Sequence, residues 1–341
     1  MMKPFGWKTI EYSNGVSASD ATFHVPILSA NELRVLSRRL TQSEDYSADV
    51  NNEPLCAEFT RRVIMELKKR VSDGDIICHV FGPIPEIAAA TPKCFQVETG
   101  IGYMCTDGAM PYRIYESAVW MHWHYGRRNK SWGHNYEFVV PNYYDLNEWP
   151  VVLSPQPKDN EPYIVVFGRL IESKGLSIVV EIATRMPSLK FILCGQGDPE
   201  PWVTQSSNLI SMAPLQGDSR APLLGNALAI LAPTSFIEPF CGSAVEAQLC
   251  GTPVVSSNFG AFWETVIDGV TGYRCNSLAD YIGAIRRAPK LNRSVIAERA
   301  RRLYSLETVG ATYNIVLNNI AQQSKLGWYS GLSNLFDSVE F

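Results

Sequence analysis

The stretch PYIVVFGRLIESKGLSIVVEIATRMPSLKFILCG, residues 162–195, decides the fold class of this chain. Its aromatic and β-branched start predicts a buried strand, its middle predicts an amphipathic helix, and its apolar end predicts a second strand. A strand, a helix and a strand in this order form a βαβ unit with parallel strands. The alternation continues to residue 257. It comprises the strands NLISMAP, LAILAPT and TPVVSS and the helices SRAPLLGNA and GSAVEAQLC. We therefore expect an open parallel sheet covered by helices on both faces, with ligands at the carboxyl ends of its strands.

The rest of the chain fits a second domain of the same α/β class. The segments KTIEY, DIICHVF and KCFQVE favour strands, and LCAEFTRRVIMELKKRV favours an amphipathic helix. Residues 142–160 are rich in Pro, Asp and Asn, which is typical of a connection between domains. We expect one domain over 1–150 and another over 151–341, since 341 residues suit two cores. The predicted helices beyond residue 277 can cap the second domain or cross back onto the first.

Composition and charge exclude several classes of protein. The formal charge of −4 argues against nucleic-acid binding, which depends on clustered Lys and Arg. Basic runs at 61–62 and 68–70 are either docking surfaces or a solvated helix face. No apolar run approaches the roughly 20 residues that span a bilayer, and the N-terminus lacks a signal-peptide core. We expect a cytoplasmic protein with no integral membrane segment, for which peripheral membrane contact remains open.

The 8 cysteines are scattered without C-x-x-C spacing, and several lie inside apolar runs. This pattern predicts reduced, buried thiols. We expect neither a disulfide framework nor a zinc site.

Two glutamates flank the start of one predicted helix, in the segment SFIEPFCGSAVEAQLC. Glu238 lies on the loop before the helix, and Glu246 lies about one turn inside it. A carboxylate at Glu246 can accept hydrogen bonds from a vicinal diol such as ribose, and Glu238 can do the same for sugar hydroxyls. The alternative is that both are exposed residues at a helix end.

The same loop predicts an anion site. It leaves the backbone amides of Phe240, Cys241 and Gly242 unpaired at a helix N-terminus, where the helix dipole favours a negative charge. A sugar diphosphate suits such a position.

Two cations follow the first strand of the βαβ unit. Gly168 lets a ligand approach the backbone, and Arg169 and Lys174 can neutralise a departing diphosphate. Gly195 begins a second glycine-containing turn after the next strand, which is a weak signal by itself. The alternative is an ordinary pair of surface cations.

Together these segments resemble the C-terminal domain of glycosyltransferase family 4, also called group 1, a retaining family with the GT-B fold. The resemblance rests on five landmarks in the family's order. They are G-R-L…K-G at 168–175, G-x-G at 195–197, E-x7-E at 238–246, G-T-P-V-V at 251–255 and G-x-x-G-Y ending at 273.

The resemblance implies two Rossmann-like domains that face each other across a cleft, with the acceptor on 1–150 and the nucleotide-sugar donor on 151–341. It implies that Arg169 and Lys174 bind the donor diphosphate and that Glu246 binds the ribose. Glu238 would bind the transferred sugar, together with the backbone of 240–242.

The N-terminal half departs from the family pattern. Tyr143 replaces the usual glycine in PNYYD, and Gly15 is the single glycine of a loop that would face the donor phosphates. Glu98 stands where the family often has a sugar-contacting histidine. It can accept a hydrogen bond or support an oxocarbenium-like transition state, or it can form a structural pair with an arginine.

The segment SAVWMHWHYG contains an H-x-H pair, His122 and His124, in a region predicted as helix. Helical spacing points these two side chains about 200° apart, which argues against a shared metal. The aromatic run can instead line the acceptor side or pack in the core.

We therefore expect transfer of a sugar from a nucleotide sugar to a hydroxyl acceptor, such as a glycan, a lipid-linked sugar or a small molecule. The resemblance implies retention of configuration and no metal or other cofactor. Alternatives stay open. The enzyme alternatives are a GT-B-type sugar-nucleotide epimerase, which would need an acid/base pair that we do not identify, and a phosphorylase. A non-catalytic sugar-nucleotide binding or scaffold subunit would fit the sparse N-terminal motifs.

Overall fold

The structure is a computed structural model that describes residues 1–15, 20–40, 54–80, 82–104, 110–131, 133, 136–157, 161–215 and 217–326. It divides into two compact units. Unit 1 comprises Met1–Ile114, His134–Phe138 and Gly310–Phe341, and unit 2 comprises Tyr115–Gly133 and Val139–Val309.

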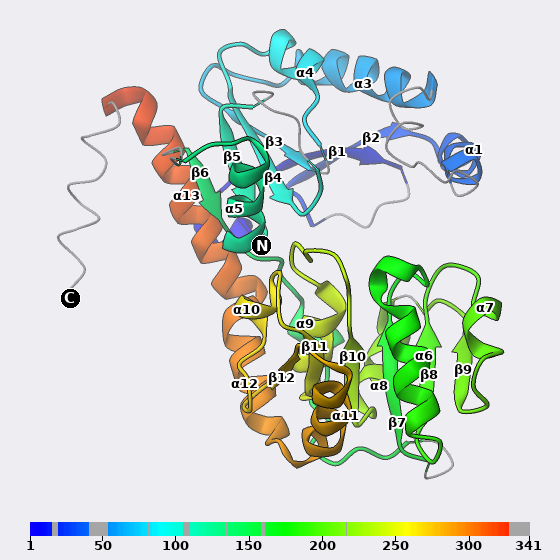
Figure 1. Ribbon diagram of the computed structural model, residues 1–341. Helices are drawn as coiled ribbons and strands as arrows, with labels where there is room; N and C mark the ends of the chain where they lie inside the picture. Colours follow the sequence, from blue (N-terminus) through cyan, green and yellow to red (C-terminus); the bar gives the residue numbers. More distant parts are fainter. Residues whose placement is uncertain are drawn as a thin grey trace, which may run out of the picture. The chain divides into compact units, whose positions relative to one another are not determined.

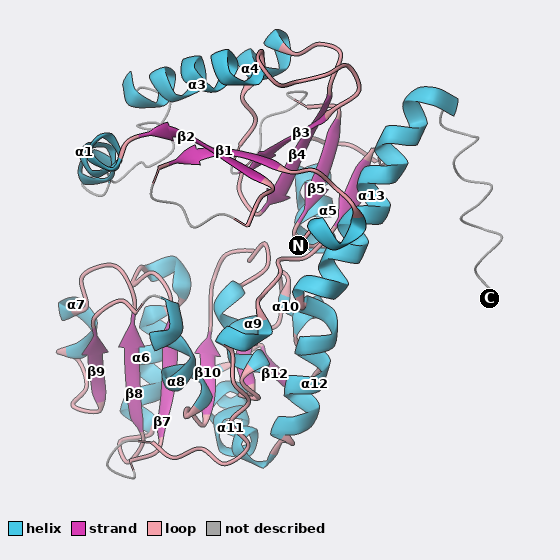
Figure 2. Cartoon of the chain, turned by 180° about the vertical axis from the view of Figure 1, so that it is seen from behind, coloured by secondary structure: helices cyan, strands magenta, loops and turns pink. Residues whose placement is uncertain are grey.

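Unit 2 contains a six-stranded sheet in the order β12-β11-β10-β7-β8-β9, and all of its strand pairs are parallel (Figure 2). Its strands are β7 (Tyr163–Phe167), β8 (Lys190–Cys194), β9 (Leu209–Met212), β10 (Ala229–Ala232), β11 (Val254–Ser257) and β12 (Gly272–Cys275). The chain builds outward from β7 to β9 and then from β10 to β12. The strand order therefore reverses between β7 and β10, and in open α/β sheets ligands bind at the carboxyl ends of the strands beside such a point.

Helices cover both faces of this sheet because alternate strand residues enter two separate cores. In β7, Tyr163 and Val165 pack into one cluster, whereas Ile164 and Val166 pack into the other. The first cluster includes apolar residues of α8, α9 and α12, and the second includes residues of α6 and α11. These helices are α6 (Leu176–Arg185), α8 (Arg220–Gly225), α9 (Gly242–Leu249), α11 (Leu278–Arg287) and α12 (Arg293–Tyr304). The parallel α/β sheet expected from residues 162–257 is confirmed.

Unit 2 also contains shorter elements around this sheet. They are the short helices α7 (Glu200–Val203) and α10 (Phe262–Thr265) and the 3-10 turns Leu146–Glu148, Glu172–Lys174, Gly217–Ser219 and Ala288–Lys290. Part of the stretch predicted as a connection between domains packs here, since Trp149 is only 2% exposed in the first cluster and Tyr144 packs against that cluster.

Unit 1 is built around two smaller sheets. A two-stranded parallel sheet pairs β1 with β2, and a four-stranded sheet has the order β3-β4-β5-β6. The last residues of β5 and β6 already belong to unit 2. The strands are β1 (Ile10–Asn14), β2 (Phe23–Leu28), β3 (Ile76–Val80), β4 (Phe95–Ile101), β5 (Tyr112–Tyr115) and β6 (Glu137–Val139). The helices are α1 (Ala30–Leu40), α3 (Pro54–Leu67) and α4 (Pro85–Ala90), with a 3-10 turn at Lys3–Phe5.

Two helices depart from a simple division of the chain into halves (Figure 1). Helix α5 (Ala118–Arg127) belongs to unit 2. Helix α13 (Leu306–Leu326) begins in unit 2 and continues in unit 1 from Gly310. In unit 1 the Nε1 of Trp7 donates to Oδ1 of Asn314 at 2.8 Å, so this part of the tail packs with the N-terminal residues.

Candidate functional site

The loops that follow β7 and β8 contact each other directly. The Gly168 amide donates to the Cys194 carbonyl at 3.1 Å, and the Leu170 amide donates to the Gln196 carbonyl at 2.7 Å. A Cβ on Gly195 would lie 1.5 Å from the Gly168 carbonyl oxygen, so only glycine fits there. Gly168 itself has a φ of 147°, which L side chains rarely adopt. The structure therefore brings these two predicted glycines together at the carboxyl ends of the strands. Arg169, which directly follows Gly168, is exposed.

The loop after β7 is also fixed to the loop after β10. The carbonyl of Ser173 accepts hydrogen bonds from the amide of Ser235 at 2.9 Å and from Oγ1 of Thr234 at 3.0 Å. A Cβ on Gly175 would lie 2.0 Å from the Pro233 carbonyl oxygen. These contacts fix the position of the loop after β7 relative to the loop after β10.

The fixed loops place Lys174 against Glu238. The Lys174 Nζ lies 2.6 Å from Oε1 of Glu238 and 4.7 Å from the centre of the Phe236 ring. The Glu238 side chain is 5% exposed and that of Lys174 is 24% exposed. The sequence predicted both residues for the site but not their direct ion pair.

The loop that precedes α9 turns through a strained residue. Cys241 has a φ of 62° and a ψ of 70°, a left-handed conformation that is uncommon for any residue except glycine. Strain of this kind persists where the surroundings enforce it. Its carbonyl accepts the amides of Ala244 and Val245 at 3.1 and 3.4 Å, which begins the helix.

The first amides of α9 have no acceptor among the described residues. No side chain caps the helix. Within the described ranges, the amides of Phe240, Cys241 and Gly242 donate to no protein acceptor. The Phe240 side chain is buried and packs edge to face on Tyr304, with ring centres 5.6 Å apart. A helix end with unpaired amides favours an anion.

Glu246 lies one turn inside α9 and is 6% exposed. Its Oε1 lies 3.2 Å from Nη1 of Arg220, on α8. Its Oε2 is buried and has no hydrogen-bond partner among the described residues. Burial raises the pKa of Glu246 from 4.5 to about 7, although Arg220 opposes this shift. One carboxylate oxygen is thus held by a cation and the other is left for a ligand.

Sequence patterns missed three residues around Glu246. The Arg220 guanidinium lies over the Trp149 ring, 5.2 Å from its centre. The Tyr144 hydroxyl donates to the Gly242 carbonyl at 3.4 Å. No local pattern marks Arg220, because it meets Glu246 only when α8 packs beside α9. Tyr144 belongs to the PNYYD segment, in which only its neighbour Tyr143, in place of the family's usual glycine, departs from the pattern.

Two predicted site residues, Gly15 and Glu98, lie in unit 1, whereas the others lie in unit 2. The Gly15 amide donates to the Leu28 carbonyl at 2.7 Å, so this glycine closes the end of β1. Residues 16–19 of the loop expected at the donor phosphates lie outside the described residues.

Glu98 lies in the middle of β4 and is fully buried. Its Oε2 is 3.5 Å from Nε of Arg113, and the Tyr103 hydroxyl donates to its Oε1 at 2.9 Å. This is the structural pairing with an arginine that the sequence allowed as an alternative to a catalytic role.

The segment with His122 and His124 forms α5, as predicted, and the two histidines differ in exposure. His122 is exposed and His124 is buried. Trp120 stacks on Trp123 with ring centres 4.4 Å apart, and His124 packs edge to face against both rings. These contacts support the packing alternative for the segment.

The N-terminus of α5 is held by a carboxylate. The amides of Ala118 and Val119 donate to the two carboxylate oxygens of Glu264, on α10, at 3.1 and 2.7 Å. A carboxylate at a helix N-terminus is stabilised by the unpaired amides and the helix dipole.

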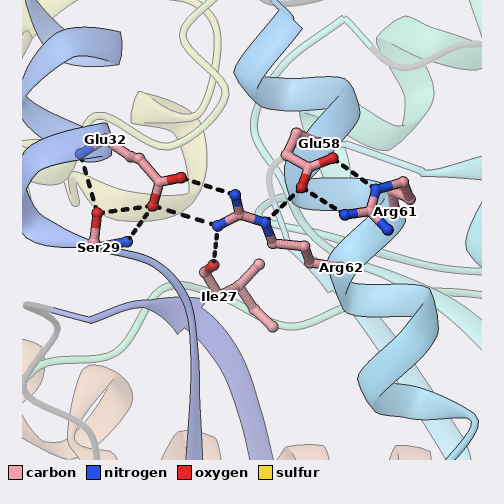
Figure 3. Close-up of polar contacts among 6 residues, drawn as sticks. All are labelled: Ile27, Ser29, Glu32, Glu58, Arg61 and Arg62. Carbon is pink, nitrogen blue, oxygen red and sulfur yellow. Dashed lines mark hydrogen bonds and ion pairs between the residues drawn. The ribbon is translucent and has the colours of Figure 1, made fainter.

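The basic run on α3 is largely neutralised by its own neighbours (Figure 3). Arg61 pairs with Glu58, and Arg62 joins Glu58 to Glu32 of α1 and also donates to the Ile27 carbonyl. Lys69 and Arg70 both pair with Glu66. The neighbouring glutamates therefore neutralise most of the positive charge that a docking surface would need. These residues fit the other alternative, a solvated helix face.

The described cysteines are free thiols, but the prediction that they are buried holds only in part: Cys194, Cys250 and Cys275 are buried, whereas Cys78 is exposed. A search of the described helices finds none with the length and apolar character required to cross a membrane.

Comparison with known proteins shows which family the central part of the chain resembles. Residues 153–302 match the family model for group 1 glycosyl transferases. The chain is 28% identical over 161 residues to a glycogen synthase of Mycobacterium tuberculosis, an alignment that covers 43% of this chain and 38% of the relative. It is 28% identical over 159 residues to a D-inositol 3-phosphate glycosyltransferase of Mycobacteroides abscessus, covering 41% and 36%. The matched region thus spans well under half the length of these relatives.

Solved structures share the fold over more of the chain. A glycosyltransferase from Rickettsia africae superposes with a TM-score of 0.65 at 13% identity, covering 87% of this chain and 85% of that one. Sucrose-phosphate synthase from Thermosynechococcus elongatus gives 0.62 at 18% identity, covering 77% of each chain. Anabaena HepE in complex with UDP and glucose gives 0.61 at 16% identity, covering 76% and 81%. The α/β architecture is that of the GT-B glycosyltransferases, and residues 153–302 are similar to the group 1 glycosyl transferases.

Proposed function

We propose that the chain transfers a sugar from a nucleotide-diphosphate sugar to a hydroxyl acceptor, with retention of configuration and without a metal ion. One observation carries the proposal. The uncapped N-terminus of α9 follows Glu238, which pairs with Lys174 of the loop after β7, and precedes Glu246, whose Oε2 is buried and unpartnered within the described chain.

Each part of this arrangement suits one part of a nucleotide sugar. The amides of 240–242 and the two cations Arg169 and Lys174 suit the diphosphate, because they can neutralise the charge that grows on it as it leaves. Glu246 suits the ribose, since a carboxylate oxygen accepts from a hydroxyl. Glu238 suits the hydroxyls of the transferred sugar. The complex of the structural neighbour HepE with UDP and glucose supports this class of ligand.

The ion pair between Lys174 and Glu238 fixes both groups before a ligand arrives. When the donor binds, Lys174 can turn its charge to the phosphate, and Glu238 can accept from the sugar. Such preorganisation lowers the cost of stabilising the leaving group. In this proposal the acceptor attacks from the face that the diphosphate leaves, and a phosphate oxygen takes its proton. The same cations support metal independence, because they supply the positive charge that a metal would otherwise bring.

A thermal-shift screen against UDP, GDP and ADP and their sugar conjugates tests the proposal. A ligand at a hundred times its dissociation constant stabilises the folded state by about 2.7 kcal/mol. We expect one nucleotide series to raise the melting temperature, and EDTA to leave both the shift and the sugar transfer intact. No shift with any series would contradict the proposal. An altered sugar nucleotide formed without an acceptor would identify an epimerase, and binding without transfer would identify a scaffold subunit.

A further inference from the structure

An ion pair in unit 2 carries two buried polar atoms that have no partner. Nη1 of Arg220 lies 3.2 Å from Oε1 of Glu246. The remaining atoms, Nε of Arg220 and Oε2 of Glu246, are buried and make no hydrogen bond within the part of the chain that the structure describes. Buried donors and acceptors are nearly always paired, so a donor and an acceptor left open on one ion pair indicate a ligand that supplies both partners.

Arg220 is held rigidly with respect to α9. Its guanidinium lies 5.2 Å from the centre of the Trp149 ring, and Trp149 is 2% exposed. Tyr144 packs edge to face on Trp149 with ring centres 6.0 Å apart, and its hydroxyl donates to the carbonyl of Gly242. Gly242 is the first residue of the helix that carries Glu246. These contacts link Arg220 to α9, the helix that carries Glu246. They therefore help to fix Nε of Arg220 and Oε2 of Glu246 in position before a ligand binds.

Hydroxyl groups of a ligand are the simplest partners for the two atoms. A hydroxyl can donate its hydrogen, which suits Oε2, or accept through a lone pair, which suits the Nε–H group. A carbon-bound hydrogen at the same place would satisfy neither atom. A site built to pair a hydroxyl discriminates strongly against the analogue that lacks it, because its buried groups are then left unpaired.

We propose that Arg220 is a specificity-determining residue of the donor site, which together with Glu246 selects a ribonucleotide over its deoxy analogue by binding a ribose hydroxyl. The inference rests on the proposed function, which puts the ribose at Glu246, and it adds a second protein group to that position. A guanidinium suits the task because it stays charged and presents its donors in a fixed plane.

The charge of Arg220 also affects the pKa of Glu246. Among the described residues, four groups interact with this carboxylate: Arg220 from α8, Glu148 from the turn before Trp149, the hydroxyl of Tyr144 and the thiol of Cys250. Burial raises the pKa of Glu246, and Arg220 lowers it. Loss of the guanidinium would therefore move the pKa upward. Binding that needs the ionised carboxylate would then reach its plateau at a higher pH.

The test is a calorimetric titration of the full chain. UDP-glucose, GDP-mannose and ADP-glucose are titrated first, and the one that binds is compared with its 2′-deoxy and 3′-deoxy analogues. We expect the wild type to bind at least one deoxy analogue about 10- to 100-fold more weakly, the loss that follows from leaving a charged hydrogen-bond partner unpaired.

Two variants separate charge from hydrogen bonding. Arg220→Met should lose most of the discrimination and shift the pH midpoint of binding upward. Arg220→Lys keeps the charge but lacks the Nε–H group, so it should lose discrimination while keeping the wild-type midpoint. It also tests the idea if Arg220→Met fails to fold. The matched control is Arg185→Met, which removes an exposed arginine that pairs with Glu181 on α6.

Three results would overturn the inference. They are equal binding of the ribo and both deoxy forms by the wild type, undiminished discrimination in both Arg220 variants, and the same loss in Arg185→Met. Failure of all three nucleotide sugars to bind the wild type would instead overturn the proposed function, and the inference with it.

Discussion

Three charged side chains of the proposed donor site, Lys174, Glu238 and Glu246, differ in their environments. Lys174 and Glu238 satisfy each other at 2.6 Å, so their cost of burial is offset before any ligand binds. Glu246 has a cation on one oxygen only, and its pKa lies at about 7. The first pair is therefore stable without ligand, whereas Glu246 is stable when protonated or when a ligand completes its hydrogen bonds.

Replacing Glu246 by Gln should make the protein more stable at high pH and less able to bind a nucleotide. The folded state holds a proton on Glu246 up to about pH 7, whereas the unfolded chain releases it near 4.5. Wild-type stability from this group therefore falls as pH rises from 4.5 to 7, by about 3 kcal/mol in all. Glu246→Gln removes this pH-dependent loss of stability, because glutamine does not titrate.

Urea unfolding between pH 4 and pH 9 measures this effect. The stability difference between Glu246→Gln and the wild type should grow through that window and be constant above it. The control is Glu200→Gln, at an exposed position. A constant difference between pH 4 and pH 9 would show that Glu246 is not shifted as described.

Replacing Lys174 by Met should lower both the folding stability and the rate of sugar transfer. A second substitution, Glu238→Gln, should separate the two effects. The change leaves the Glu238 carboxylate buried without its cation, which costs about 3 kcal/mol. Adding Glu238→Gln removes that charge and should restore most of the stability. Turnover should fall about 100- to 1000-fold in both variants, because the diphosphate loses a preorganised cation.

Chemical denaturation and initial transfer rates measure the two effects. Lys190→Met is the control, since Lys190 pairs with the exposed Glu161 and such surface pairs contribute about 0–1 kcal/mol. Full activity in the double variant would remove Lys174 from the donor site.

At the scale of elements, the loops after β7, β8 and β10 make backbone contacts that only glycine permits at Gly175 and Gly195. The loops after β7, β8 and β10 are joined by backbone hydrogen bonds, and these fix the positions of the side chains that they carry. The predicted glycine turns were a weak sequence signal because many turns need glycine. The contact of 1.5 Å that a Cβ on Gly195 would make explains why this one is required.

Gly195→Ala should therefore separate the loops that follow β7 and β8. We expect a loss of about 4 kcal/mol or more, which is the range of severe steric conflicts in a core. Gly126→Ala is the matched control, because Gly126 lies in α5 and a Cβ there would meet nothing within 4 Å. That change should be neutral or stabilise the helix by up to about 1 kcal/mol. Equal melting temperatures for both variants would refute the close approach of the loops.

At the scale of the molecule, sequence patterns predicted unit 2 well and unit 1 less fully. Strand and helix periods located β7 to β11 because buried parallel strands form continuous apolar runs. The E-x7-E spacing correctly placed Glu238 on the loop and Glu246 inside α9.

Other features depend on tertiary packing and leave no local signal. The ion pair of Glu246 with Arg220 needs two helices to pack side by side, and the assignment of α5 to unit 2 follows from contacts such as those of Glu264 with its first amides. The sequence left open whether Glu98 contacts the sugar or pairs with an arginine, because its buried partner Arg113 lies on a neighbouring strand.

The anomeric configuration of the first product tests retaining transfer most directly. The nucleotide sugar that binds best is incubated in EDTA with the protein and a panel of hydroxyl acceptors that includes water, and the anomeric proton is followed by NMR before mutarotation. The account predicts that an α-linked donor gives an α-linked product or α-sugar first, and that Glu246→Gln slows its formation. A β-configured first product would contradict it.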